Sequence, residues 1–335
     1  MELAEEKFEA ENPLARWSAH SVLLAVSGGA DSTALVRLFH HFRTAFGLKI
    51  YVAHANHQLR GAESDGDAAF VSSLCQKLAI PLRAERLQIV RTPDGLEADA
   101  RRARYAFLEE TAEAFGCRYL ALAHHRNDQA ETILHRILRG TGVAGLAGMA
   151  RMRPLNGAVT LIRPLLGFSR EEILRYLQAI GQEWRTDSSN FSTELTRNRI
   201  RQVLLPQLQE TFNPQIDEAL VRLGALADSM QSFVDSQVEK LAKISLRPAP
   251  DGLRVVPVPN VETFLWSELF RRIWRVARLP QQEMGREEWE LLVRMLLKEP
   301  NAPETHDFPG RVSVIREEEA LLLRGNFKEM AFQVP

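Results

Sequence analysis

The chain has 335 residues, of which 45% are hydrophobic and 25% are charged, as is usual for a folded protein with a large core. This length predicts two domains. The formal net charge of −1 provides no overall attraction to nucleic acid, so any contact with RNA has to come from local basic patches.

The cysteine content argues against several kinds of site. Cys75 and Cys117 are the only cysteines, and they lie far apart and outside any Cys-x-x-Cys pair. This pattern argues against a disulfide framework, a zinc ribbon or a sulfur-carrying dithiol, and we expect both residues to be buried. The acidic N-terminus lacks the apolar core of a signal peptide, and no apolar run reaches membrane-spanning length. We therefore expect no membrane contact and a cytoplasmic protein.

The first predicted elements enclose a short polar loop. Residues 1–20 are polar and weakly amphipathic, and the apolar run over residues 22–26 predicts a buried strand. Apolar residues at i, i+3, i+4 and i+7 then predict an amphipathic helix over residues 35–42. The loop between strand and helix consists of Ser27, Gly28, Gly29, Ala30, Asp31 and Ser32.

This loop has the properties of an anion site. Two adjacent glycines allow a sharp turn and close approach of a ligand, and we expect Gly29 to need a positive φ. The helix N-terminus offers unpaired N–H groups, the serines offer hydroxyl groups, and Asp31 would lie beside a phosphate if Mg²⁺ bridged the two. The alternative is a tight turn in which Asp31 or Ser32 only caps the helix. A Walker A loop is excluded because no Gly-Lys-Ser/Thr follows.

The next segments alternate between strand and helix. They cover residues 50–53, 71–78, 82–90, 96–115, 119–123 and 129–138. Such alternation predicts an α/β domain with a doubly wound, mostly parallel sheet, whose ligand lies at the carboxyl ends of the strands.

Polar side chains follow the ends of two predicted strands. His54 and His57 follow the second strand and lack further metal ligands, so we expect His54 to line the nucleotide pocket or to cap the loop. His124, Asp128 and Glu131 follow a later strand at the catalytic edge. Asp128 and Glu131 can also form a capping box, with Asp128 as the N-cap.

Arginines recur on two predicted helices of this domain. Glu97, Arg101 and Arg104 share one face, which is either a solvated salt-bridge stripe or faces the cleft and binds a phosphate or a carboxylate. Arg197, Arg199 and Arg201 form a local positive patch or a solvated helix end. Between these helices, residues 140–148 are rich in glycine and predict a flexible loop over the cleft.

The pattern changes near residues 205–215, which divides the chain into domains 1–210 and 211–335. The second domain is predicted to be smaller and mainly helical, with a long helix over residues 216–244 and a short β element near residues 312–315 and 321–323. Arg271, Arg275 and Arg278 repeat at i, i+4 and i+7 beside Trp274. This stripe suits RNA phosphates and base stacking, or is an exposed structural face.

Several motifs together resemble the tRNA(Ile)-lysidine synthases, a family of PP-loop ATP pyrophosphatases. The similarity covers roughly residues 20–205. The matching segments are the Ser-Gly-Gly-Ala-Asp-Ser loop, Glu97 to Tyr105, His124 to Thr132, Arg139 to Gly142, Arg163 to Leu166, Asp187 to Asn190 and Arg197 to Arg201. The family often has an acidic pair where this chain has Asn127 and Asp128, so only Asp128 is carried over.

The resemblance implies a reaction at the wobble cytidine of tRNA(Ile) with a CAU anticodon. ATP with Mg²⁺ on Asp31 adenylates the C2 carbonyl oxygen, and free L-lysine then displaces AMP to form lysidine. Asp128, Glu131 or His124 would hold or deprotonate the lysine amine, and Arg101 would bind an anionic group. A 2-thiolation enzyme with the same loop and a non-catalytic RNA-binding protein are the alternatives. Amine specificity and oligomeric state stay open.

Overall fold

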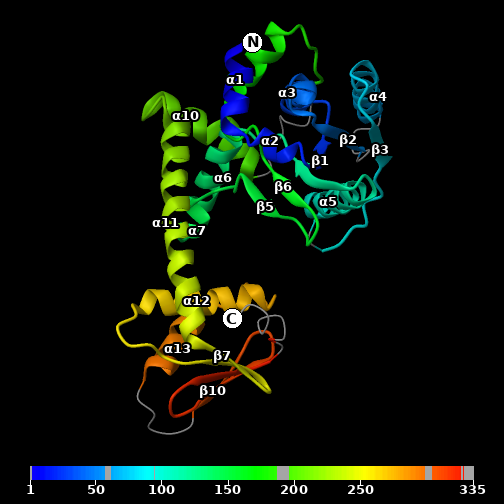
Figure 1. Ribbon diagram of the computed structural model, residues 1–335. Coiled ribbons are helices and arrows are strands. Elements are labelled where there is room, and N and C mark those ends of the chain that lie inside the picture. The colour runs from blue at the N-terminus through cyan, green and yellow to red at the C-terminus, as the bar shows by residue number, and fades with distance from the viewer. Residues whose placement is uncertain are drawn as a thin grey trace. The chain divides into compact units, whose positions relative to one another are not determined.

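Two compact units make up the protein, which is shown as a computed structural model in Figure 1. The structure describes residues 2–56, 62–93, 95–186, 196–298, 304–325 and 327. The units comprise Met1–Ala227 and Asp228–Pro335, so the division falls inside helix α11 (Ile216–Ser245) and not near residues 205–215. The physical reason is that the first turns of α11 belong to the first unit, where Leu220 packs in one cluster with Ile133 and Leu134.

The first unit contains a six-stranded sheet of order β3-β2-β1-β4-β6-β5. Its strands are β1 (Ser21–Ala25), β2 (Lys49–Asn56), β3 (Leu82–Arg86), β4 (Cys117–Ala121), β5 (Met152–Pro154) and β6 (Thr160–Ile162). All neighbouring pairs are parallel except β5 and β6, which are antiparallel. The predicted α/β class with a mostly parallel sheet is therefore confirmed.

Helices lie on both faces of this sheet, with α5 on one face and α3, α4 and α8 on the other. The helices described in this unit are α1 (Glu2–Glu11), α2 (Leu14–Trp17), α3 (Ala30–Phe46), α4 (Ala62–Lys77), α5 (Leu96–Ala114), α6 (Arg126–Leu138), α7 (Val143–Leu146), α8 (Arg170–Ala179), α9 (Thr196–Arg199), the π-helical turn η2 (Ile200–Leu204) and α10 (Leu205–Thr211).

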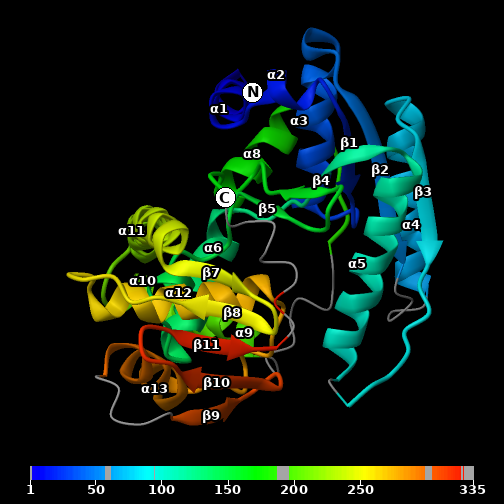
Figure 2. The ribbon, with the colours of Figure 1, turned by 60° about the horizontal axis from the view of Figure 1, so that its bottom comes forward.

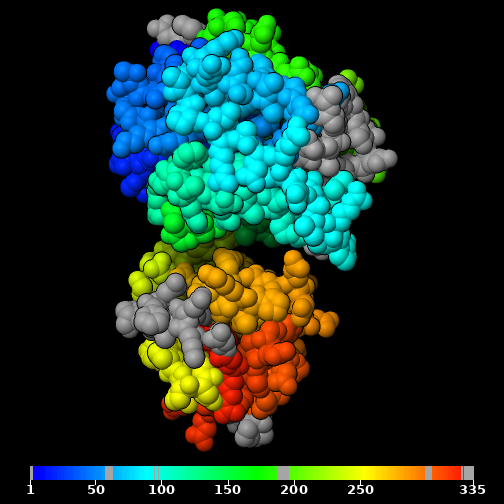
Figure 3. Space-filling model, turned by 90° about the vertical axis from the view of Figure 1, so that its right-hand side faces the viewer, coloured from blue at the N-terminus to red at the C-terminus, as the bar shows by residue number. Residues whose placement is uncertain are grey.

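Alternation along β1 assigns the two faces. Val22 and Leu24 pack in the core formed with α3, α4 and α8, whereas Leu23 packs with Phe107 and Leu108 of α5. Helices α3 and α8 contact each other on the same face, as Figure 2 shows. In the space-filling view, the cyan residues of α4 and α5 form much of the visible surface of this unit (Figure 3). This packing fixes the N-termini of α3 and α8, which carry site residues.

The second unit combines helices with an antiparallel sheet. The helices are the end of α11, α12 (Thr263–Val276) and α13 (Arg286–Leu297). The five-stranded sheet has the order β7-β8-β11-β10-β9, with β7 (Leu246–Ala249), β8 (Gly252–Val255), β9 (Thr305–Phe308), β10 (Val312–Arg316) and β11 (Leu321–Arg324). The β element is thus larger than the short one predicted, because β7, β8 and β9 join it. The core of this unit includes Trp266, Trp274 and Trp289.

Across the described parts of the chain, no helix is both long enough and apolar enough to cross a membrane. The two cysteines are free and buried, as predicted, and burial raises the pKa of the Cys75 thiol to about 11 and that of Cys117 to about 12.

Candidate active site

The candidate site lies where the strand order reverses. Chain connections run outward from β1 through β2 to β3 on one side, whereas β4 lies on the other side of β1. The loops that leave the carboxyl ends of β1 and β4 therefore face each other at a topological switch point, where open α/β sheets bind their ligands. The loop after β1 carries Asp31, and the loop after β4 carries His124 and His125.

The loop after β1 is closed by its own serines. Ser32 Oγ accepts hydrogen bonds from the backbone N–H groups of Ser27 and Gly28, both at 3.2 Å, and donates to the carbonyl of Gly29 at 3.1 Å. Ser27 Oγ lies 3.2 Å from Ser32 Oγ. Ala30, Asp31 and Ser32 form the first turn of α3, where N–H groups have no partner within the helix. Converging N–H and hydroxyl groups at a helix N-terminus form a phosphate site.

The two glycines have different roles in this loop. Gly28 has a φ of +95°, whereas Gly29 has a φ of −68° and is the N-cap residue of α3. The expectation that Gly29 needs a positive φ was therefore wrong, because the turn is completed one residue earlier. A Cβ on Gly29 would meet Ser27 Oγ at 3.6 Å and no closer heavy atom in the described chain, so any effect there comes from space needed by a ligand.

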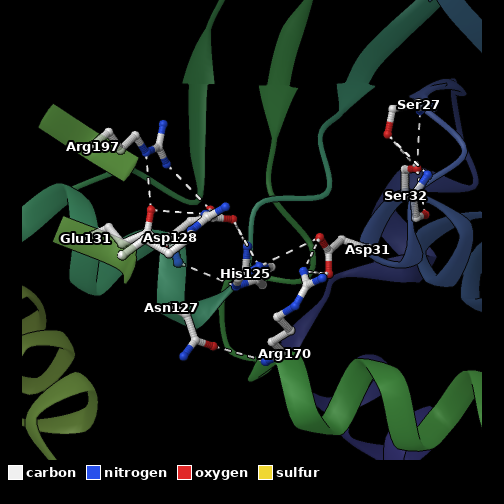
Figure 4. Close-up of polar contacts among 11 residues, drawn as sticks. Ser27, Asp31, Ser32, His125, Asn127, Asp128, Glu131, Arg170 and Arg197 are labelled. Carbon is white, nitrogen blue, oxygen red and sulfur yellow. Dashed lines mark hydrogen bonds and ion pairs between the residues drawn. The ribbon is translucent and has the colours of Figure 1, made fainter. Parts of the chain in front are cut away.

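Asp31 already has a cationic partner. Arg170 Nη1 lies 3.4 Å from Oδ1 and 3.2 Å from Oδ2 of Asp31, and His125 Nε2 lies 3.8 Å from Oδ2 (Figure 4). No group of three or more His, Cys, Asp or Glu side chains in the described ranges is arranged to hold a metal ion. Mg²⁺ is commonly bound by one or two carboxylates together with substrate phosphates, so the partly exposed carboxylate of Asp31 fits that need beside a phosphate loop.

His54 supports the loop from the neighbouring strand. Its Nδ1 lies 2.8 Å from the carbonyl oxygen of Val26, so Nδ1 carries the proton and donates it to the residue that precedes the loop. Its Nε2 is buried, and no partner for it occurs among the described residues. His54 therefore fixes the end of β1 and keeps one acceptor for a further hydrogen bond. His57 lies outside the described residues.

Helix α6 begins one turn earlier than predicted. His125 is its N-cap, and Asp128 is the third helical residue of the capping box: Asp128 Oδ2 accepts from His125 N at 3.0 Å. Asp128 is thus not the N-cap, and Glu131 is not part of the box, because the helix already begins at Arg126. His125 was not a predicted site residue, although its position beside His124 at a strand end was the available signal.

Two arginines that were expected to contact RNA bind carboxylates instead. Arg201 Nη2 donates to Asp128 Oδ1 at 2.7 Å and to Glu131 Oε2 at 3.0 Å. Arg197 Nε donates to Glu131 Oε2 at 3.3 Å. The predicted positive patch is therefore largely neutralised. Arg199, which lies between them in sequence, is exposed.

These arginines close a pocket of about 400 Å³ in the first unit. The lining residues are Ala100, Arg101, Arg104, His124, Asp128, Arg197, Asn198 and Arg201. Arg101 and Arg104 thus face the cleft, which was one of the two alternatives for this helix face. The Cζ atom of Arg101 lies 5.0 Å from the centre of the Tyr105 ring, so the guanidinium group stacks on that ring. Because Arg197 and Arg201 pair with Asp128 and Glu131, the remaining positive charge of this lining comes from Arg101 and Arg104, and it favours a ligand with a carboxylate or a phosphate. The side chain of Glu97 lies outside the described residues.

The protonation of His124 follows from its contacts. Arg163 Nε donates to His124 Nδ1 at 3.2 Å, so the proton of the neutral imidazole is on Nε2. Burial lowers the pKa of His124 to about 4, with Arg163 and two other arginines acting in the same direction and Asp128 against them. At neutral pH His124 is therefore a hydrogen-bond donor and not a base.

Asp128 keeps its negative charge in the same pocket. Burial favours its neutral form, but contacts with His125 and Arg201 outweigh this and hold the pKa of Asp128 below its ordinary value. Glu131 is buried beneath the two arginines and does not line the pocket. Asp128 is thus the carboxylate that a bound ligand can reach.

Asn127 is turned away from the loop carboxylates. Its Oδ1 accepts from the backbone N–H of Arg170 at 3.0 Å, and its Nδ2 donates to Asp217 Oδ2 at 2.8 Å. Asn127 therefore does not form a two-carboxylate metal site with Asp128, and its side chain instead joins α8 to α11. Neither Arg170 nor Asp217 was recognised from the sequence.

The glycine-rich segment after α6 is held more firmly than predicted. It contains the one-turn helix α7, and Gln129 Oε1 accepts from Met149 N at 2.7 Å. Arg136 Nη1 donates to the carbonyls of Gly145 and Gly148 at 2.8 and 2.7 Å. Two side chains of α6 therefore clamp this segment, in place of the flexible loop that was expected.

The arginine stripe of the second unit is only partly regular. Arg271 Nε lies 3.3 Å from Glu268 Oε1, and Arg271 Cζ lies 4.8 Å from the centre of the Trp289 ring. Arg275 is exposed. Arg278 lies beyond the end of α12 with a φ of +54°, so it does not continue the helical face. Trp274 is fully buried and is not available to stack on a base, contrary to the expectation. Residues 187–190, another segment with family resemblance, lie outside the described residues.

Comparisons with known proteins identify related sequences. Residues 3–208 match the family model described as a PP-loop domain. Among curated proteins, a tRNA(Ile)-lysidine synthase from Bacteroides thetaiotaomicron is 37% identical over 84% of this chain and 68% of its own length. Those from Thermosynechococcus vestitus and Symbiobacterium thermophilum are 35% and 44% identical, over 86% and 76% of this chain. The chain spans 82% of the former but only 54% of the latter.

A solved structure has a similar fold. The U34-tRNA thiolase NcsA from Methanococcus maripaludis, with its [4Fe-4S] cluster, covers 68% of this chain and 78% of its own chain with a TM-score of 0.57. Its sequence identity of 16% restricts the likeness to the fold.

Proposed function

Because the chain belongs to the tRNA(Ile)-lysidine synthase family and contains its PP-loop domain, we propose that it attaches L-lysine to the wobble cytidine of tRNA(Ile) with a CAU anticodon. ATP first adenylates the C2 carbonyl oxygen of the base and releases pyrophosphate. The lysine amine then attacks C2 and releases AMP. The observation that carries this proposal is the pairing of a phosphate loop with a positive pocket, joined through His125 and Asp128 (Figure 4).

The phosphates of ATP fit the loop after β1. The N–H groups of the first turn of α3 and the hydroxyl of Ser27 are the donors, while Ser32 holds the shape of the loop through Gly29. Asp31 is the residue that would hold Mg²⁺, which would neutralise charge on the phosphates and on departing pyrophosphate. Nε2 of His54 supplies a hydrogen-bond acceptor close to the end of β1.

Lysine fits the pocket because it carries both signs of charge. Its carboxylate suits Arg101 and Arg104, which present guanidinium groups to the cavity. Its ammonium suits Asp128, whose lowered pKa keeps a negative charge there. A carboxylate of this kind holds the ammonium in place by its charge, whereas its lowered pKa makes it a weak base for the proton of the attacking amine. His124 donates from Nε2 and so serves as a hydrogen-bond donor, while Glu131 holds Arg197 and Arg201 in place.

The second unit is proposed to contact the tRNA without taking part in the reaction. Arg275 is exposed on α12 and is the best placed of its arginines to bind a phosphate, together with Arg278. Arg271 has a packing role as well, because it stacks on Trp289. In the first unit, exposed Arg199 is the remaining candidate of its group.

A 2-thiolation reaction is the competing function. That chemistry needs reactive or cluster-binding cysteines, whereas Cys75 and Cys117 of this chain are buried thiols on separate elements, α4 and β4. Their raised pKa values oppose formation of a thiolate. These properties favour ligation of an amine.

The experiment is incubation of the protein with radiolabelled lysine, ATP and transcripts of tRNA(Ile) with a CAU anticodon. We expect ATP-dependent incorporation that an unlabelled competing amine does not reduce, and no incorporation into a transcript with a uridine at the wobble position. Asp31→Ala is expected to abolish AMP formation while leaving the fold intact, because the residue lies in the first turn of α3 with a partly exposed side chain and not in the core. Lack of incorporation by the wild type would contradict the proposed function, and near-normal turnover of the variant would contradict the role of Asp31.

A further inference from the structure

Arg170 has a position that the proposed reaction does not yet explain. Its guanidinium group contacts both carboxylate oxygens of Asp31, and half of its side chain is exposed, at 49%. The partner residue lies 139 positions away in sequence, in the first turn of α3. Arg170 therefore places a full positive charge at the edge of the phosphate loop from a different helix.

Several contacts fix this placement. Arg170 is the first residue of α8, and a complete capping box of Ser169 and Glu172 sets the start of that helix. The backbone N–H of Arg170 donates to Asn127 Oδ1 at 3.0 Å. Below it, Ile173 and Leu177 of α8 pack in the same core as α3. The start of α8 is thus rigidly placed, while the guanidinium group itself can move.

The loop needs a cation from elsewhere. Its six residues, 27–32, include no lysine or arginine, unlike a Walker A loop, which brings its own lysine. Arg197 and Arg201 are engaged by Asp128 and Glu131. Among the arginines that the structure describes, Arg170 is the one paired with Asp31, so binding of a cation by Asp31 would release this guanidinium group next to the phosphates.

We propose that Arg170 is the residue that binds the departing pyrophosphate. In the free enzyme it rests on Asp31, and it moves to the β- and γ-phosphates once the nucleotide occupies the loop. This assignment rests on the proposed function for its substrate, but the chemistry is that of any adenylyl transfer from ATP. The C2 oxygen of the base forms a bond to the α-phosphorus, and the bond from that phosphorus to the bridging oxygen breaks. The electron pair stays on the bridging oxygen, which leaves with the pyrophosphate, and Arg170 stabilises the charge gained there.

The test compares Arg170→Gln and Arg170→Lys with a matched control, Arg175→Gln. Arg175 is exposed on the same helix, and its Nε donates to the carbonyl of Glu171. Thermal unfolding first establishes that all variants fold as the wild type does. AMP formation is then measured with tRNA and lysine, and binding of magnesium pyrophosphate is measured by calorimetry without either.

We expect Arg170→Gln to lower kcat for AMP formation by about 100-fold, as loss of one charge-stabilising donor does in other enzymes, and to weaken pyrophosphate binding at least tenfold. Arg170→Lys should recover part of both, and KM for lysine should not change. Wild-type pyrophosphate affinity in Arg170→Gln would overturn the inference. Because that measurement needs neither tRNA nor lysine, it decides the role of Arg170 even if the wild type fails to incorporate lysine, a result that would contradict only the proposed function.

Discussion

The contact between Asn127 and Asp217 allows a stringent test of how the site is built. Asn127 donates to Asp217 Oδ2 at 2.8 Å and accepts from the backbone of Arg170. Gln209 Nε2 also donates to Asp217 Oδ2, at 3.3 Å, while Asp217 Oδ1 is buried without a partner in the described chain. Replacing Asn127 with aspartate keeps the acceptor for Arg170 but places two carboxylates against each other.

The magnitude follows from that geometry. The variant loses a hydrogen bond to a charged group and gains a repulsion between like charges, which together cost about 2–4 kcal/mol at neutral pH. For a unit of this size, such a loss lowers Tm by about 5–15 °C. The double variant Asn127→Asp with Asp217→Asn restores the contact with donor and acceptor exchanged. It should therefore regain most of the stability, while Asp217→Asn alone should lose about 1 kcal/mol.

The assay is denaturant or thermal unfolding of the four proteins, from which a coupling energy is calculated. Burial already raises the pKa of Asp217 in the wild type, against the opposing effect of Asn127. A second carboxylate raises the pKa of the pair further, so the folded variant binds more protons than the unfolded chain at intermediate pH. The loss of unfolding free energy in Asn127→Asp, relative to the wild type, should therefore become smaller as pH falls from 7 towards 4. Additive effects of the two substitutions, or a deficit independent of pH, would refute this reasoning.

Three further predictions follow from the same structure. Gly28→Ala should destabilise the first unit by about 1–2 kcal/mol, since alanine disfavours the φ of +95°, whereas Gly29→Ala should unfold like the wild type; equal Tm values for both would contradict the assignment. The pKa of His124 is lowered from 6.5 to about 4, so the unfolded chain binds the extra proton and stability falls as pH drops through that interval. Between pH 7 and 5, the free energy of unfolding of His124→Gln should therefore fall by about 2 kcal/mol less than that of the wild type. The same pH dependence in both proteins would contradict this prediction. Arg275→Gln should reduce the salt slope of tRNA binding by about one without changing Tm, while Arg271→Gln should also lose about 0.5–1 kcal/mol of stability because its stacking on Trp289 is removed. Identical salt slopes would show that α12 does not contact RNA.

Local patterns in the sequence were sufficient for those parts of the site that depend on one element. The six-residue loop at a strand end predicted the anion site, and spacing of i and i+3 correctly placed Arg101 and Arg104 on one face. The Ser169 and Glu172 capping box was equally readable, because both partners lie within one turn of α8. Each of these features is decided by residues close together in the chain.

Contacts between distant elements could not be read in the same way. Three arginines in five residues looked free, because the carboxylates that bind Arg197 and Arg201 lie 66 to 73 residues earlier. Likewise, Asn127 looked like a weakened metal ligand until α8 and α11 supplied its partners. Trp274 was expected to be available beside the arginine stripe, but the helix turns it into the core. Charge pairing of this kind depends on the tertiary fold.

The pairing of each site carboxylate with an arginine affects how substrates bind. Asp31 rests on Arg170, and Asp128 and Glu131 share Arg201, so each of these three described carboxylates has a cationic partner before ligands arrive. An ammonium or a metal ion that reaches Asp31 or Asp128 therefore exchanges one ion pair for another, and the displaced guanidinium group becomes available to an anion. A ligand that carries both charges, such as lysine or a metal-bound nucleotide, satisfies both halves of the exchange at once. We expect a ligand with one charge to leave a partly buried group unpaired, so the cost of desolvation would disfavour simple amines and free anions.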